Sequence, residues 1–227
     1  MTADSHAGRR PASQHLLPQI WFCRITAASR QSPQTLYKTV TPHLKKTLEI
    51  EINNYEKPIK ELIGKSISDV NYYEIDYGEP LWDESEYHSL DFGIELITDD
   101  REKYYFVWDS EYTQYNVKFK KGEILEVFSP ENNAKKYNAK ENQNWTELIG
   151  KKICGIKSFW SYWSLINEKE RNYYPQDVRI EFENGKEIWI SAFEIKDETN
   201  FGMQDHITIF FDKQTAEKYN IGKENVV

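Results

Sequence analysis

The sequence predicts an α+β protein made of two tandem copies of a small antiparallel β-sheet unit, each ending in a short helix and preceded by a disordered N-terminal tail. Three observations predict this: a five-residue word that occurs twice, a recurring order of apolar strands and turns, and a change of composition near residue 47. The predicted boundaries are 1–47 for the tail, 48–142 for copy one and 143–227 for copy two.

The repeat begins with the word Glu-Leu-Ile-Gly-Lys, which occurs at 61–65 and again, 86 residues later, at 147–151. Two further matches follow in the same order, 94–96 with 180–182 at the same offset and 127–138 with 209–220 at an offset of 82. Changes in loop length produce a drift of this kind. The ordered matches favour duplication over chance, and units of this length indicate two small domains rather than a solenoid.

The tail differs from the rest in charge as well as composition. Residues 1–47 hold seven Lys and Arg against one acid and carry +6, whereas the remaining residues carry −14. We interpret the tail as an extension; a transit peptide and then a secretory signal are the alternatives, because the tail contains Arg and Ser and its short apolar stretch is interrupted. Cys23 and Cys154 have no metal-ligand spacing and suit a reducing compartment, so we expect a cytoplasmic protein.

Residues between the tail and the first strand predict a lead-in. Leu44, Leu48, Ile50 and Ile52 indicate a short extended segment after Pro42. A helical face then ends at Gly64, and its apolar positions are Tyr55, Ile59, Leu62 and Ile63. In copy two, Asn144 would cap a short helix that ends at Gly150.

Alternation and turn residues predict the strands. The expected strands are 66–75, 90–98, 103–110, 115–120 and 123–128 in copy one, and 152–159, 177–183, 186–193 and 206–212 in copy two. Asn184-Gly185 indicates a hairpin, and a two-residue turn would place Glu183 opposite Lys186 and Ile180 opposite Trp189. Short helices are expected at 130–137 and, capped by Asp212, at 213–219.

Two long insertions, at 76–87 and 160–176, read as irregular loops, and loops on a rigid sheet commonly carry binding residues. The first is acidic and the second aromatic. The candidate partner-binding residues are Asp76, Glu79, Trp82, Asp83, Glu84 and Glu86 in the first loop, and Trp160, Trp163 and Tyr173 in the second. Core packing is the favoured interpretation of the second cluster, whereas the acidic flanks of Trp82 favour its partial exposure.

No motif predicts a catalytic residue, a metal site or a cofactor. The acids of the first loop are typical of a solvated loop, and the two histidines outside the N-terminal region, His88 and His206, have no convincing third ligand. The sequence contains no nucleophile elbow, phosphate-binding glycine loop or Cys-His pattern.

The acidic body disfavours nucleic-acid binding, and no apolar run approaches the ~18 residues of a membrane span. The favoured function is a non-enzymatic module that binds a basic protein partner, as an immunity-type protein that neutralises a basic toxin would. A carbohydrate- or cell-surface-binding module that uses Trp160, Trp163 and the nearby tyrosines is the alternative. A hydrolase that uses Asp83, Glu84 or His206 is the third interpretation.

Overall fold

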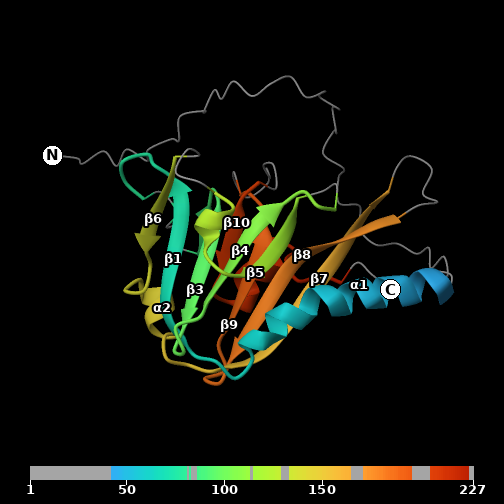
Figure 1. The fold of residues 1–227 in the computed structure, drawn as a ribbon, viewed down its shortest axis with the longest axis horizontal. Coiled ribbons are helices and arrows are strands. Elements are labelled where there is room, and N and C mark those ends of the chain that lie inside the picture. The colour runs from blue at the N-terminus through green and yellow to red at the C-terminus, as the bar shows by residue number, and fades with distance from the viewer. Residues whose placement is uncertain are drawn as a thin grey trace. The chain divides into compact units, whose positions relative to one another are not determined.

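The computed structural model describes residues 42–80, 82, 86–112, 115–128, 133–164, 171–195 and 205–224. The chain divides into two compact units, Met1–Thr39 and Val40–Val227, and every described residue belongs to the second. Two antiparallel sheets of five strands, with few helices, make up this unit (Figure 1). The predicted α+β class with antiparallel sheets is therefore confirmed.

The first sheet has the strand order β5-β4-β3-β1-β6 and the second has the order β2-β10-β9-β8-β7. The first consists of β1 (Ile67–Ile75), β3 (Gly93–Thr98), β4 (Lys103–Asp109), β5 (Asn116–Lys121) and β6 (Ala134–Asn138). The second consists of β2 (Tyr87–Leu90), β7 (Ile153–Ser164), β8 (Arg171–Phe182), β9 (Glu187–Ala192) and β10 (Ile207–Phe210).

The helical segments are α1 (Pro42–Ile59), η1 (Lys60–Leu62), η2 (Ile124–Glu126), α2 (Gln143–Thr146) and α3 (Lys213–Lys218). Of the helices within the described ranges, none combines the length and the apolar character that crossing a membrane requires. Asp212 caps α3 as predicted, because its carboxylate accepts the backbone N–H of Thr215. Asn142 rather than Asn144 caps α2.

Each sheet contains a four-stranded antiparallel meander and one additional strand. The meanders are β1-β3-β4-β5 and β7-β8-β9-β10, while β6 pairs with β1 and β2 pairs with β10. Because β2 precedes β3 in the chain, the first half of the chain supplies an edge strand to the second sheet. The single strand predicted at 90–98 is therefore wrong: its first residue belongs to β2 and its last six form β3, in different sheets.

Each copy of the repeated word makes a backbone hydrogen bond to the strand that follows the other copy. The N–H of Gly64 donates to the carbonyl of Ile153 at 2.8 Å, and the N–H of Gly150 donates to the carbonyl of Ile67 at 2.8 Å. The second bond repeats the first at the offset of 86. Both glycines have positive φ, 89° and 75°, a conformation that glycine adopts without a Cβ clash.

The strands that follow the word share one irregularity. The pairing of β1 with β3 shifts register between Ile67 and Asp69, and the pairing of β7 with β8 shifts between Ile153 and Gly155. A bulge of this kind bends a strand and increases its twist. The two meanders therefore begin with the same local geometry.

The hairpin predicted at Asn184-Gly185 forms, but in another register. Phe182 donates to the carbonyl of Lys186 at 2.9 Å, which closes a three-residue loop, and Ile180 pairs with Ile188 instead of Trp189. The two-residue turn is wrong because Gly185, with φ of 79°, occupies the left-handed third position of a longer loop. Arg101, with φ of 67°, occupies the same position between β3 and β4.

Three other segments differ from the predictions. The extended segment after Pro42 is the first half of α1. The segment predicted as a strand at 123–128 contains η2 instead. Ile124 and Phe128 are both buried, and their spacing of four residues suits a helical turn. The short helix at 130–137 is contradicted by β6, whose pairing with β1 satisfies the backbone along Ala134–Asn138 and overrides local propensity.

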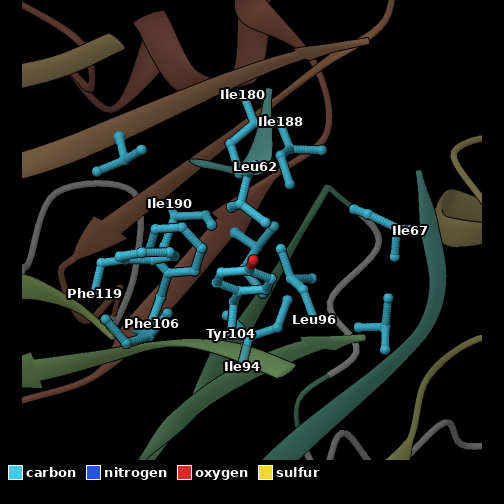
Figure 2. Close-up of a cluster of buried hydrophobic side chains, with 14 of the residues drawn as sticks. Leu62, Ile67, Ile94, Leu96, Tyr104, Phe106, Phe119, Ile180, Ile188 and Ile190 are labelled. Carbon is cyan, nitrogen blue, oxygen red and sulfur yellow. The ribbon is translucent and has the colours of Figure 1, made fainter. Parts of the chain in front are cut away.

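Facing sides of the two sheets share one apolar core (Figure 2). Figure 2 shows side chains from the two sheets pointing toward each other, with Leu62 of the repeated word between them. The labelled residues are Ile67, Ile94, Leu96, Tyr104, Phe106 and Phe119 from the first sheet, and Ile180, Ile188 and Ile190 from the second. Leu148, the equivalent of Leu62, is also buried in this core.

A buried polar network holds β2 to the rest of the unit. The Tyr72 hydroxyl on β1 lies 2.7 Å from Nδ1 of the fully buried His88 on β2, and Nε1–H of Trp145 on α2 donates to the same hydroxyl at 2.5 Å. The Tyr72 oxygen accepts from Trp145, and its second contact is with the ring nitrogen of His88. The network thus joins both sheets and α2.

We predict that Tyr72→Phe lowers the free energy of unfolding by about 2–3 kcal/mol, because it leaves polar nitrogens of His88 and Trp145 buried without their shared partner. Urea unfolding measures this change. The control is Tyr105→Phe on β4, whose hydroxyl has no hydrogen bond within the described ranges. Equal changes in the two variants would contradict the role of the network.

Candidate functional site

The acidic loop after β1 carries three described candidate residues on its surface. Asp76 pairs with Lys135 at 2.9 Å, and this hydrogen bond holds the pKa of Asp76 below its ordinary value. Glu86 pairs with Lys218 at 3.2 Å, and Glu79 is exposed. Asp83 and Glu84 lie outside the described residues. Lysines therefore already neutralise part of this loop.

Trp82 is buried, with 8% of its surface exposed, and the partial exposure predicted for it is wrong. Its ring makes edge contacts with Tyr72 and His88, with both centroid distances 4.8 Å. The apolar area that Trp82 buries in these ring contacts outweighs the tendency of its acidic neighbours to keep it exposed to water. Trp82 therefore attaches the acidic loop to the core.

Residues 160–164 and 171–176 of the aromatic insertion are paired strands, which corrects the irregular loop predicted at 160–176, while 165–170 lie outside the described residues. β7 and β8 pair as far as Ser164 and Arg171, with one register shift after Phe159. Trp160 and Tyr174 are buried, in agreement with the favoured core interpretation. Trp163 and Tyr173 are partly buried, whereas Tyr162 is 36% exposed.

An open cleft of about 330 Å³ lies between α1, the end of β4 and the outer part of this hairpin. It is lined by Thr47, Leu48, Glu51, Glu111, Tyr112, Arg171, Asn172 and Tyr173. Of the candidate binding residues predicted from sequence, only Tyr173 lines it. Trp160 lies behind the wall, because its ring packs edge-on against Tyr112 at a centroid distance of 5.7 Å.

Two carboxylates and several rings give the cleft its chemistry. Burial, and then the charges of Glu111 and Glu51, raise the pKa of Tyr112, so both carboxylates act on the same hydroxyl. Glu111 also lies 3.4 Å from Lys118. The Arg171 guanidinium lies 4.5 Å from the centre of the Tyr162 ring, a cation–π geometry.

Glu56 fixes the helix that forms one wall of the cleft. Its carboxylate accepts the N–H and the hydroxyl of Ser158 on β7, at 3.2 and 2.7 Å, and pairs with Lys60 at 2.7 Å. Burial would raise the pKa of Glu56, but the hydrogen bonds from Lys60 and Ser158 outweigh it, so the pKa lies below its ordinary value. Tyr55 adds a hydrogen bond to the Val117 carbonyl on β5.

A second polar cluster lies where β9 ends and β10 begins. Ligand atoms of Glu194, Asp205 and His206 lie within 4.8 Å of one another, and Asp91 lies 3.3 Å from the His206 ring. Burial would lower the pKa of His206, but hydrogen bonds to Asp205 and Asp91 raise it to about 9. These are the described residues best placed to hold a metal ion.

We predict that Glu56→Gln lowers the free energy of unfolding by about 1 kcal/mol near neutral pH, because hydrogen bonds to a charged acceptor are stronger than those to an amide. A carboxyl whose folded pKa is lowered stabilises the fold above its unfolded pKa, and this contribution is lost as the pH falls through the folded value. Denaturant unfolding from pH 7 to pH 3 should show the difference shrinking, with exposed Glu49→Gln as control. A constant difference across this range would contradict a charge effect.

Sequence reasoning missed Glu51, Glu111, Tyr112 and Arg171 as lining residues of one cleft. They come from three separate segments, and only the pairing of β7 with β8 and the position of α1 bring them together. The exposed position of Glu51 could have been predicted only if the segment after Pro42 had been interpreted as a helix instead of an extended segment. No protein-family model, curated protein or solved structure matches this chain.

Proposed function

We propose that this protein is a non-enzymatic module that binds a basic protein partner, as an immunity-type protein that neutralises a basic toxin would. In this proposal, the cleft between α1 and the β7–β8 hairpin receives a Lys or Arg side chain of the partner. The observation that carries it is the combination of the Glu51 and Glu111 carboxylates with the Tyr112 and Tyr173 rings in one open cleft. Carboxylates pair with the cation, and aromatic rings cover its apolar stem.

The charge of the chain supports the same partner. Residues 48–227 carry −14, so the potential around them attracts cationic proteins and accelerates their encounter. Such long-range attraction is screened beyond about 10 Å at 0.1 M salt. Binding should therefore be strongly salt-dependent.

The hairpin already stacks a guanidinium of its own. Arg171 lies over the exposed Tyr162 ring, at the rim of the cleft. An arginine from a partner could make the same kind of contact with Tyr173, whose ring centre is 6.0 Å from that of Tyr162. Arg171 also places a positive charge at the rim, which opposes an incoming cation, so Glu51 and Glu111 have to supply the attraction.

In this proposal, the acidic loop contributes to the negative electrostatic potential around the protein and not to a specific contact. Because Asp76 and Glu86 pair with lysines at the surface, each retains only a modest attraction for a partner. A direct role in binding for Asp76, Glu79, Asp83, Glu84 and Glu86 stays a prediction.

Carbohydrate binding is the second candidate, and the exposed Tyr162 ring is the observation that favours it. A stacking platform needs several exposed rings, and the burial of Trp160 removes one of the two tryptophans of the hairpin. Glycan binding that is insensitive to salt and lost in Trp163→Ala would favour this candidate.

We also infer that the described unit arose by tandem duplication, with copies at 48–142 and 143–227. The reciprocal bonds of Gly64 and Gly150 and the shared bulges of β1 and β7 support this inference. The copies differ in their last segments. The similar residues at 134–138 form β6 in copy one, whereas those at 216–220 include the end of α3 in copy two.

We predict that the double variant Glu51→Gln with Glu111→Gln, which removes both carboxylate charges from the cleft, binds an arginine-rich peptide about tenfold more weakly than the wild type at low salt. Calorimetric titration of the full chain measures the affinity. The wild-type affinity should fall steeply at about 0.3 M salt, because the ionic atmosphere screens the carboxylates.

The matched control removes the same charge away from the cleft, through Glu141→Gln with Glu217→Gln, both at exposed positions. Its affinity should change much less than that of the cleft variant. Equal losses of affinity in the two double variants would show that the overall charge alone attracts the peptide, and would contradict the cleft as the binding site. If the wild-type protein shows no salt-dependent binding of the peptide, the proposal of a basic partner is wrong.

A further inference from the structure

We propose that Glu194, Asp205 and His206 form a binding site for one transition-metal ion of the zinc class. Their ligand atoms, one imidazole nitrogen and two carboxylate oxygens, lie within 4.8 Å of one another. The site does not share residues with the cleft, so it is independent of the proposed partner binding.

Strand pairing brings the two carboxylates together. β9 and β10 pair with Ala192 opposite Ile207, and the N–H of Phe193 donates to the carbonyl of His206 at 3.0 Å. Continuing this register places Glu194 opposite Asp205. Like charges that face each other across strands are destabilising unless a cation lies between them. The pairing thus gathers negative charge at this point.

Asp91 orients His206 as metal-binding histidines are commonly oriented. Its Oδ1 lies 3.3 Å from Nε2 of His206, while its Oδ2 accepts the backbone N–H of Ile75 at 3.1 Å. With Nε2 held in this way, Nδ1 is directed toward Asp205, whose Oδ1 is 3.4 Å away. Metal-bound histidines typically donate their other ring nitrogen to a carboxylate. Asp91 is therefore a positioning residue and not a ligand.

The donor set selects the class of ion. Mg²⁺ and Ca²⁺ prefer ligands that are all oxygen, whereas a mixed set of imidazole and carboxylate suits Zn²⁺ and its neighbours. Bonds of about 2.0–2.2 Å in a tetrahedral site separate the ligands by about 3.4 Å. His206 and Asp205 already have this separation. Glu194 would complete a set of three protein ligands, which leaves one position for water or another ligand.

The competing explanation is an ion-pair cluster that needs no metal. A protonated His206 between Asp91 and Asp205 would balance part of the negative charge. The two explanations differ in whether the cluster takes up a metal ion with defined stoichiometry.

The test is a titration of the metal-free full chain with Zn²⁺, followed by calorimetry, and with Co²⁺, followed by visible absorption. We expect one equivalent to bind saturably, and the Co²⁺ spectrum to show nitrogen and oxygen ligation without a thiolate band. His206→Gln and Asp205→Asn should each weaken this binding by more than about a hundredfold. Asp91→Asn should weaken it about ten- to hundredfold, because it removes only the orientation of the ring.

Glu217→Gln on α3 is the control for the loss of one acid, and it should leave the affinity unchanged. Circular dichroism checks that each variant folds; if His206→Gln does not fold, Glu194→Gln and Asp91→Asn carry the test. Absence of saturable binding up to about 1 mM, or binding that these variants do not alter, would overturn the proposal. A thiolate band would assign the ion to a cysteine and would equally overturn it.

Discussion

The reciprocal backbone hydrogen bonds from each copy of the repeated word to the strand after the other copy are the contact on which the rest of the fold depends. Gly64 and Gly150 each end a helical turn with positive φ and donate to the first residue of the strand that follows the other copy of the word. The word also sends Leu62 and Leu148 into the shared core. One short sequence thereby ends a helix, starts a strand and joins the two sheets.

This junction brings the sheets together at one end, while β2 ties them together elsewhere. β2 belongs to the first half of the chain but pairs with β10, and the hydrogen bond between His88 and Tyr72 holds it against β1. Trp82 packs on the same two rings, so the acidic loop is attached to the core, while its described carboxylates at Asp76, Glu79 and Glu86 are exposed. Neither sheet can separate without breaking buried polar contacts, whose loss is costly.

The sequence predicted the features that depend on local pattern: the antiparallel strands, the Asp212 cap and the hairpin position. It failed where tertiary contacts decide. β6 pairs with β1 although its residues match those of α3 in sequence, and the loop at Gly185 has three residues where the Asn-Gly dipeptide predicted two. Of the residues that line the cleft, Tyr173 was predicted from the sequence but Glu51 and Glu111 were not, because no local pattern indicates which distant segments will face each other.

Both proposed sites lie where the two halves of the unit differ. The cleft needs α1 and the outer parts of β7 and β8, which at 12 residues each are longer than the 9 and 6 of β1 and β3. The acid–histidine cluster needs Asp91, which follows the strand that crosses between the sheets. The common meanders supply a rigid frame in both halves. Binding residues then come from the added segments, because these can vary without disturbing the core that the two sheets share.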